Sequence, residues 1–194
     1  QTIDEGITNP ASVSYVEEDV RNVFSQGKAA FATNWVYMYD LVNFNEDESQ
    51  VTGKVKMSLM PAFADSGVVS ATQDGSMGFS VAAESPAKES AWEYVKYITS
   101  EDVQNRYSAH LLPIWETSFQ GEQLETLMSY SASNETTVPM FSEQFPYSYV
   151  RPKVPFYPEA SKALQLALQE ALTMTKSPQE ALDDAAQKWV SFAE

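Results

Sequence analysis

Apolar side chains recur three and four positions apart along much of this chain, a spacing that places them on one face of an α-helix. The clearest example follows the capping-box pair Ser14 and Glu17 and stops before Gly27, a residue suited to end a helix. Another is opened by Ser177 and Pro178 near the end of the chain. By these criteria, helices are expected over residues 14–26, 35–42, 85–98, 99–109, 121–130, 158–173 and 177–190.

Shorter apolar runs have the length and composition of β-strands. They cover residues 29–33, 54–59 and 77–83, and the first is expected to be buried. Short strands that alternate with helices predict an α/β fold, in which a small sheet is flanked by helices and the C-terminal region is mostly helical.

The segment from Arg151 to Pro158 contains several prolines and is expected to be extended. Two interpretations stay open for it, a rigid connector or the lining of a ligand site. A polar stretch over residues 131–137 precedes this segment, and its Asn134 and Thr136 form a glycosylation sequon by pattern alone.

Composition and charge narrow the class of partner. The chain has 194 residues, of which 43% are hydrophobic and 12% aromatic, and this predicts a folded globular protein. Its 27 acidic and 12 basic residues give a net charge of -15, and the basic residues are scattered. Nucleic acid and anionic lipid are therefore excluded as partners, because both require grouped positive charge. No apolar run approaches the roughly 18 residues of a membrane-spanning helix.

Metal and cofactor chemistry are not predicted. Cysteine is absent, which removes disulfides, thiolate nucleophiles and cysteine-based metal sites. Asn43, Asn45 and Asp47 imitate the first ligands of a calcium loop, but Glu48 stands at the sixth position, where such a loop needs glycine. We expect a solvated loop there, no metal, no cofactor and no catalytic residue.

Two aromatic residues, Trp35 and Tyr37, come directly after the predicted strand 29–33. In open α/β sheets, ligands bind at the carboxyl ends of strands, where a planar ring offers an apolar face. Two interpretations remain open from the residues alone: the rings pack in a core, or they meet a ligand.

Several separated segments resemble one family. They are Phe24–Phe31, Asp74–Ser80, Ser85–Glu101, and Arg151–Ser161 together with Ser177–Leu182. Their order and spacing are similar to those of the maltose-type extracellular solute-binding proteins of ABC sugar importers. The resemblance implies a type II periplasmic-binding-protein-like fold, with two α/β lobes joined by hinge segments and a sugar held in the cleft between them.

The resemblance covers only the second half or so of a family member. It implies that residues 1–83 and 136–194 form the second lobe, and that residues 84–135 cross back to a first lobe whose N-terminal part is absent from this sequence. The chain also begins at Gln1 without a signal pattern, so we expect a processed or excised piece.

The resemblance also implies a set of ligand-binding residues. Trp35 and Tyr37 would stack on or edge a sugar ring, the backbone of the turn at Asp74, Gly75 and Ser76 would meet hydroxyls, and Arg151 would offer its forked donors. The full set is Trp35, Tyr37, Asp74, Gly75, Ser76, Met77, Arg151 and Tyr157, with Phe156 as an alternative to Tyr157. Met77 stands where many relatives have an aromatic residue.

The expected function is a non-catalytic sugar receptor. The resemblance implies a carbohydrate ligand, transfer to the transmembrane subunits of an ABC permease, and an extracytoplasmic location, in the periplasm or as a cell-surface lipoprotein. Contact with the membrane would occur only through the permease or a lipid anchor outside this segment. A glycoside hydrolase or another carbohydrate-active enzyme fragment, which would use paired carboxylates, and a protein-interaction domain are the alternatives.

Overall fold

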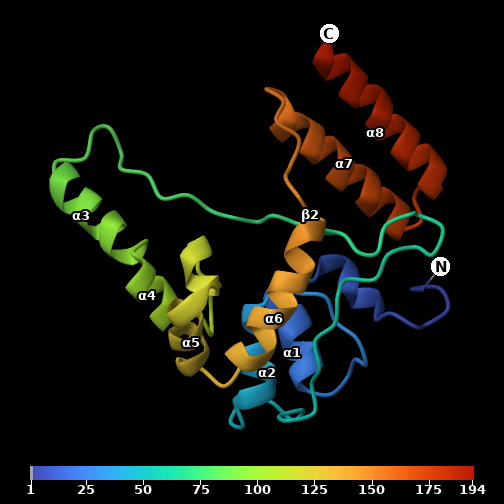
Figure 1. Ribbon diagram of the computed structural model, residues 1–194. Helices are drawn as coiled ribbons and strands as arrows, with labels where there is room; N and C mark the ends of the chain where they lie inside the picture. Colours follow the sequence, from blue (N-terminus) through green and yellow to red (C-terminus); the bar gives the residue numbers. More distant parts are fainter. Residues whose placement is uncertain (1) are drawn as a thin grey trace. The chain divides into compact units, whose positions relative to one another are not determined.

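The computed structural model describes residues 2–194, which divide into two compact units (Figure 1). The terminal unit combines the residues up to Val16 with Arg151–Glu194, and the central unit is Glu17–Val150.

The terminal unit is built on a helical hairpin. Helices α7 (Tyr157–Leu172) and α8 (Pro178–Ala193) lie side by side, as Figure 1 shows, and the 3-10 helix η1 (Pro10–Ser14) comes from the start of the chain. The hairpin core consists of small side chains, namely Ala167, Ala181 and Ala185, with Ala171 packed against them. Alanines let the two helix backbones approach closely, so a small buried area is enough to join them.

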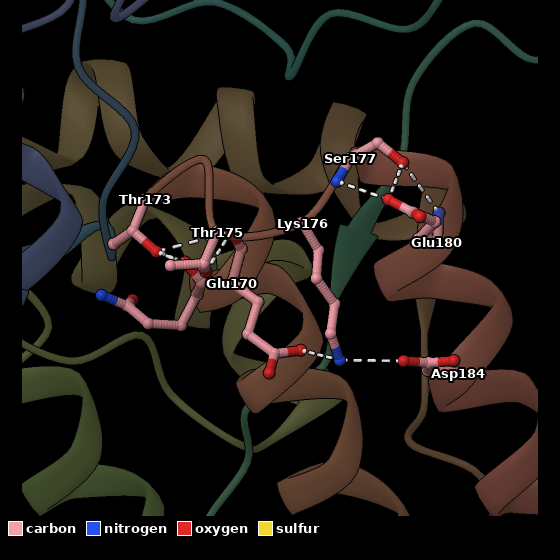
Figure 2. Close-up of polar contacts among 8 residues, drawn as sticks. Glu170, Thr173, Thr175, Lys176, Ser177, Glu180 and Asp184 are labelled. Atoms are coloured by element: carbon pink, nitrogen blue, oxygen red, sulfur yellow. Dashed lines mark hydrogen bonds and ion pairs between the residues drawn. The ribbon is translucent and has the colours of Figure 1, made fainter.

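The turn of this hairpin is held by short-range polar contacts (Figure 2). Met174 has φ 61°, and the amide of Thr175 donates to the Glu170 carbonyl at 2.9 Å, which ends α7 in a left-handed turn. Ser177 and Glu180 form the predicted capping box at the start of α8. The sequence therefore predicted both the start of α8 and its cap correctly.

A lysine bridges the two helices of the hairpin. The Nζ of Lys176 lies 2.9 Å from Glu170 Oε2 and 2.8 Å from Asp184 Oδ2, and Figure 2 shows it extending between the two carboxylates. The hydrogen bond and charge of Lys176 lower the pKa of Asp184 below its ordinary value. At the other end of the hairpin, Trp189 Nε1 donates to the Ala160 carbonyl at 2.8 Å.

The central unit is mainly helical. Its helices are α1 (Glu17–Ser25), α2 (Tyr37–Phe44), α3 (Lys88–Ile98), α4 (Glu101–Arg106), α5 (Gly121–Ser129) and α6 (Asn134–Gln144), with short 3-10 helices η2 (Glu116–Phe119) and η3 (Phe145–Tyr147). Its buried apolar side chains come from α2, α4, α5 and α6 and include Met38, Val42, Val103, Leu127 and Val138. Gly27, at φ 68°, ends α1 as predicted, whereas Ser14 lies in η1 rather than at the cap of α1.

Helix α6 was not predicted, because its first residues are polar and Pro139 lies inside it. Asn134, at its first turn, is fully buried. Its Nδ2 donates to Ser108 Oγ at 2.7 Å and to the Leu127 carbonyl at 2.6 Å. The polar stretch noted in the sequence therefore contains the start of α6 and joins α4, α5 and α6.

The sheet of the described chain is a single parallel pair, β1 (Thr72–Gln73) with β2 (Ser148–Tyr149). The predicted strands at 29–33, 54–59 and 77–83 were wrong, since these segments form neither strand nor helix in residues 2–194. The expected burial of the first was also wrong, because the Phe31 side chain is 93% exposed. A strand needs a neighbour for its backbone N–H and C=O groups, and within the described residues these runs have none.

Residues 2–194 contain no helix that combines the length and apolarity needed to cross a lipid bilayer.

Candidate functional site

The predicted turn at Asp74, Gly75 and Ser76 lies at the carboxyl end of β1. The Asp74 amide donates to the Tyr149 carbonyl of β2 at 2.9 Å, which continues the pairing of the two strands into the turn. Asp74 Oδ1 accepts from the Ser76 amide at 2.8 Å and from the Ser76 hydroxyl at 2.6 Å, and these bonds lower the pKa of Asp74. The turn is thus closed by its own side chains at the place where an α/β sheet meets ligands.

Trp35 lies against this turn. A Cβ atom added to Gly75 would stand 2.4 Å from Cη2 and 2.5 Å from Cζ3 of the Trp35 indole. Both are carbons of the outer edge of the six-membered ring, so that edge rests on the Gly75 backbone. Because half of the Trp35 side chain is exposed (50%), the ring also presents surface to solvent. The structure therefore brings together Trp35 and the predicted turn.

The residues around Trp35 are tied to the first turn of α1. Asn34 Nδ2 donates to the Glu17 carbonyl at 2.8 Å, while Asn34 Oδ1 accepts from the Trp35 amide at 2.7 Å. On the other side, the Tyr37 hydroxyl donates to Glu18 Oε1 at 2.6 Å. The backbone that carries the indole is thus held before and after Trp35.

The Tyr37 hydroxyl belongs to a charged network. Arg21 contacts Glu18 Oε2 at 2.6 Å and Glu48 Oε2 at 3.2 Å, so Glu18 links Tyr37 to Arg21. Burial and the hydrogen bond to Glu18 raise the pKa of Tyr37 to about 12, and the hydrogen bonds from Tyr37 and Arg21 lower the pKa of Glu18. Tyr37 is therefore a neutral donor whose proton is engaged within the protein.

The other predicted residues are placed as follows. Met77 follows the turn with 87% of its side chain exposed. Arg151, the second residue after β2, and Tyr157, the first residue of α7, belong to the terminal unit, and their ligand contacts stay predictions from the resemblance.

Two residues that hold the surroundings of Trp35, Asn34 and Glu18, were not predicted from the sequence. An asparagine directly before Trp35 was a local signal for Asn34, because its side chain can bond to the neighbouring backbone.

A concavity of about 660 Å³ lies in the terminal unit, lined by the α7–α8 turn and by Thr2, Ile3 and Asp4. It contains none of the predicted site residues. Among residues 2–194, no three His, Cys, Asp or Glu side chains are grouped in a way that could hold a metal ion.

A family model for bacterial extracellular solute-binding proteins matches residues 1–105, which is more than half of the chain. The chain belongs to this family. The family agrees with the resemblance drawn from the sequence.

Individual relatives of this solute-binding protein agree with the family match. A probable ABC transporter-binding protein of Deinococcus radiodurans is 34% identical over 102 residues, which are 52% of this chain and 23% of that protein. A putative binding protein of Brucella abortus is 25% identical over 190 residues, which are 96% of this chain and 42% of that protein. The chain thus spans less than half the length of these relatives.

A solved structure confirms the fold class. Maltose-bound MalE3 of T. maritima matches 100% of this chain with a TM-score of 0.77 and 25% identity, and the match covers 47% of the MalE3 chain. The α/β, periplasmic-binding-protein-like fold predicted from the sequence is therefore confirmed, while its sheet within this chain is reduced to β1 and β2.

Proposed function

We propose that this chain is part of the substrate-binding component of an ABC importer and that its ligand is a sugar or oligosaccharide. The observation that supports this best is the half-exposed Trp35 indole, held against the turn at the carboxyl end of β1. The maltose in the MalE3 structure supports the choice of a carbohydrate.

The chemistry of a sugar suits this arrangement. A pyranose has apolar C–H faces that pack on an aromatic ring, and hydroxyls around its rim that need donors and acceptors. The Trp35 ring supplies the flat face. The Asp74–Ser76 turn supplies polar backbone and side-chain groups beside that face.

In the full-length protein, residues 1–83 and 136–194 are proposed to form one lobe, and residues 84–135 to complete another, with the sugar in the interlobe cleft. Helix α3 supports this assignment, because none of its residues is buried and its Trp92 and Tyr97 are 55% and 61% exposed. Large apolar side chains that are exposed on α3 are suited to pack in a core formed with a further part of the protein.

The proposal extends to location and partners. The family description, extracellular solute-binding protein, supports an extracytoplasmic location. Delivery of the bound sugar to the permease would follow from closure of the two lobes around it, a population shift driven by contacts to both lobes.

A titration of the full-length protein tests the ligand class. Maltose, maltotriose, trehalose and glucose are added while tryptophan fluorescence and melting temperature are followed. We expect at least one sugar to bind, and Trp35→Ala to weaken that binding about tenfold or more, because burial of one large apolar face stabilises by about 1.5–3 kcal/mol.

The matched control is Phe63→Ala, which removes an aromatic ring of the same unit that is 85% exposed. It should leave the affinity unchanged. A protein that responds to amino acids, peptides or metal ions and to none of the sugars would contradict the proposed ligand class.

A further inference from the structure

We propose that Gly75 is a positioning residue for the binding platform: its missing side chain lets the Trp35 indole rest edge-on against the turn, and this contact sets the orientation in which the ring meets a sugar. The sugar part of the inference rests on the proposed function. The positioning part concerns the free protein and can be tested without ligand.

The first step is the space at Gly75. An added Cβ would lie 2.4, 2.5 and 3.5 Å from Cη2, Cζ3 and Cζ2 of Trp35, and the first two distances are shorter than any that carbon atoms adopt in contact. The five glycines with positive φ do not include Gly75. A side chain at this position is therefore excluded by the indole and not by the backbone conformation.

The second step is that the backbone on both sides of Trp35 is held in place. Asn34 ties the Trp35 amide to the Glu17 carbonyl, and the hydrogen bond of Tyr37 to Glu18 holds the chain just after it. A methyl group at Gly75 would have to be accommodated by rotation of the ring about its own side-chain bonds.

The third step is that the turn is held as well. Asp74 Oδ1 closes the turn through Ser76, and the Asp74 amide is paired with Tyr149 of β2. Since the turn and the backbone that carries the indole are each held by bonds of their own, the contact between ring and turn orients the ring relative to the polar groups of the turn. A pyranose on that ring has its rim hydroxyls directed by the same geometry.

The experiment compares Gly75→Ala with Gly78→Ala in the full-length protein labelled with 5-fluorotryptophan. Gly78 is a matched control, because no atom lies within 4 Å of a Cβ added there. The fluorine resonance that disappears in Trp35→Phe is assigned to Trp35. In the free protein we expect Gly75→Ala to move this resonance and Gly78→Ala to leave it in place.

Affinity for the tightest-binding sugar of the panel gives the second readout. Gly75→Ala should weaken binding about tenfold, because the displaced ring no longer meets the sugar in its original orientation, and Gly78→Ala less than about twofold. In the Trp35→Phe background the effect of Gly75→Ala should fall below about twofold, because phenylalanine lacks the outer edge of the indole and leaves room for the methyl group.

The outcomes separate the two proposals. A Trp35 resonance that Gly75→Ala does not move, or an equal loss of affinity with tryptophan and phenylalanine at position 35, would overturn the positioning role. If the resonance moves as expected and no sugar binds to the unsubstituted protein, the positioning role stands and the proposed ligand class fails.

Discussion

The α7–α8 hairpin and the segment from Lys28 to Ala83 use their apolar residues in opposite ways. The hairpin buries Ala167, Ala181 and Ala185 between two regular helices. Apart from helix α2, which buries Met38 and Val42, the segment leaves large side chains in solvent, with Phe31, Phe63 and Met77 each at least 85% exposed.

The difference follows from where each region finds its hydrogen bonds. A helix satisfies its backbone groups within itself, so α7 and α8 need from each other only an apolar face. The extended parts of the segment need a second strand for their backbone groups, and of the segment only Thr72–Gln73 has one, in β2. The alanine seam therefore joins α7 and α8 within this chain, although larger hairpin side chains such as Leu166 and Val190 are 51% and 62% exposed, whereas the extended parts of the segment around Trp35 have only apolar surface left for other partners.

The largest expected effect comes from overfilling the hairpin. Ala181→Leu adds volume at a fully buried position between α7 and α8 and should destabilise the hairpin by about 1–3 kcal/mol. Ala186→Leu, on an exposed position of the same helix, is the control. Hydrogen exchange of the α7 and α8 amides measures the effect, and equal protection in both variants would show that the alanine interface does not hold the helices together.

The capping box is expected to matter less. Ser177→Ala removes the side-chain acceptor for the Glu180 amide and should cost about 1 kcal/mol of hairpin stability. Ser191→Ala, which loses only a bond to the Lys188 carbonyl, should cost little. Denaturant unfolding followed by circular dichroism compares the two, and a larger loss in Ser191→Ala would contradict this view of the turn.

The bridge formed by Lys176 should stabilise the hairpin less than the capping box does, and its contribution to stability should depend on pH. Because Lys176 lowers the folded-state pKa of Asp184, the stabilisation is fully present above the ordinary aspartate pKa of about 3.9 and is lost as pH falls through the lowered value. Lys176→Gln should therefore lower the melting temperature at pH 7 and converge with the unsubstituted protein toward pH 2.5. A constant difference in melting temperature between the two proteins over this whole pH range would contradict a stabilising role of the Lys176–Asp184 ion pair.

The smallest effect is expected in the extended segment. Phe31→Ser changes a side chain that is 93% exposed and should alter the stability of this chain by less than about 0.5 kcal/mol. A loss comparable to that of Ala181→Leu would show that Phe31 is buried in solution, and the contrast between the two regions would then fail.

The sequence predicted those parts of the fold whose signals are local. The capping pair Ser177 and Glu180 and the stop at Gly27 are short-range features, and both were confirmed. The apolar run at 29–33 was assigned to a strand because its composition was right, but pairing depends on residues distant in the chain. Helix α6 was missed because Asn134 and Pro139 obscure a pattern that tertiary contacts complete.

The candidate site divides in the same way. Trp35 could be named from its position after an apolar run, and the turn at Gly75 from the family resemblance. The contact between Trp35 and Gly75 and the hydrogen bond from Tyr37 to Glu18 could not be predicted, because composition and spacing do not show that these residues meet in the fold. The predicted contributions of Arg151 and Tyr157 stay predictions.

The interior position of Asn134 has a consequence for producing this protein. Asn134, Glu135 and Thr136 match the acceptor pattern for N-linked glycans, yet transfer takes place on the carboxamide nitrogen of an accessible loop. Here that nitrogen is enclosed and bonded to Ser108 and Leu127. The folded chain therefore offers no accessible acceptor at this position, so protein that is already folded when it meets a glycan transferase should gain no carbohydrate mass on Asn134.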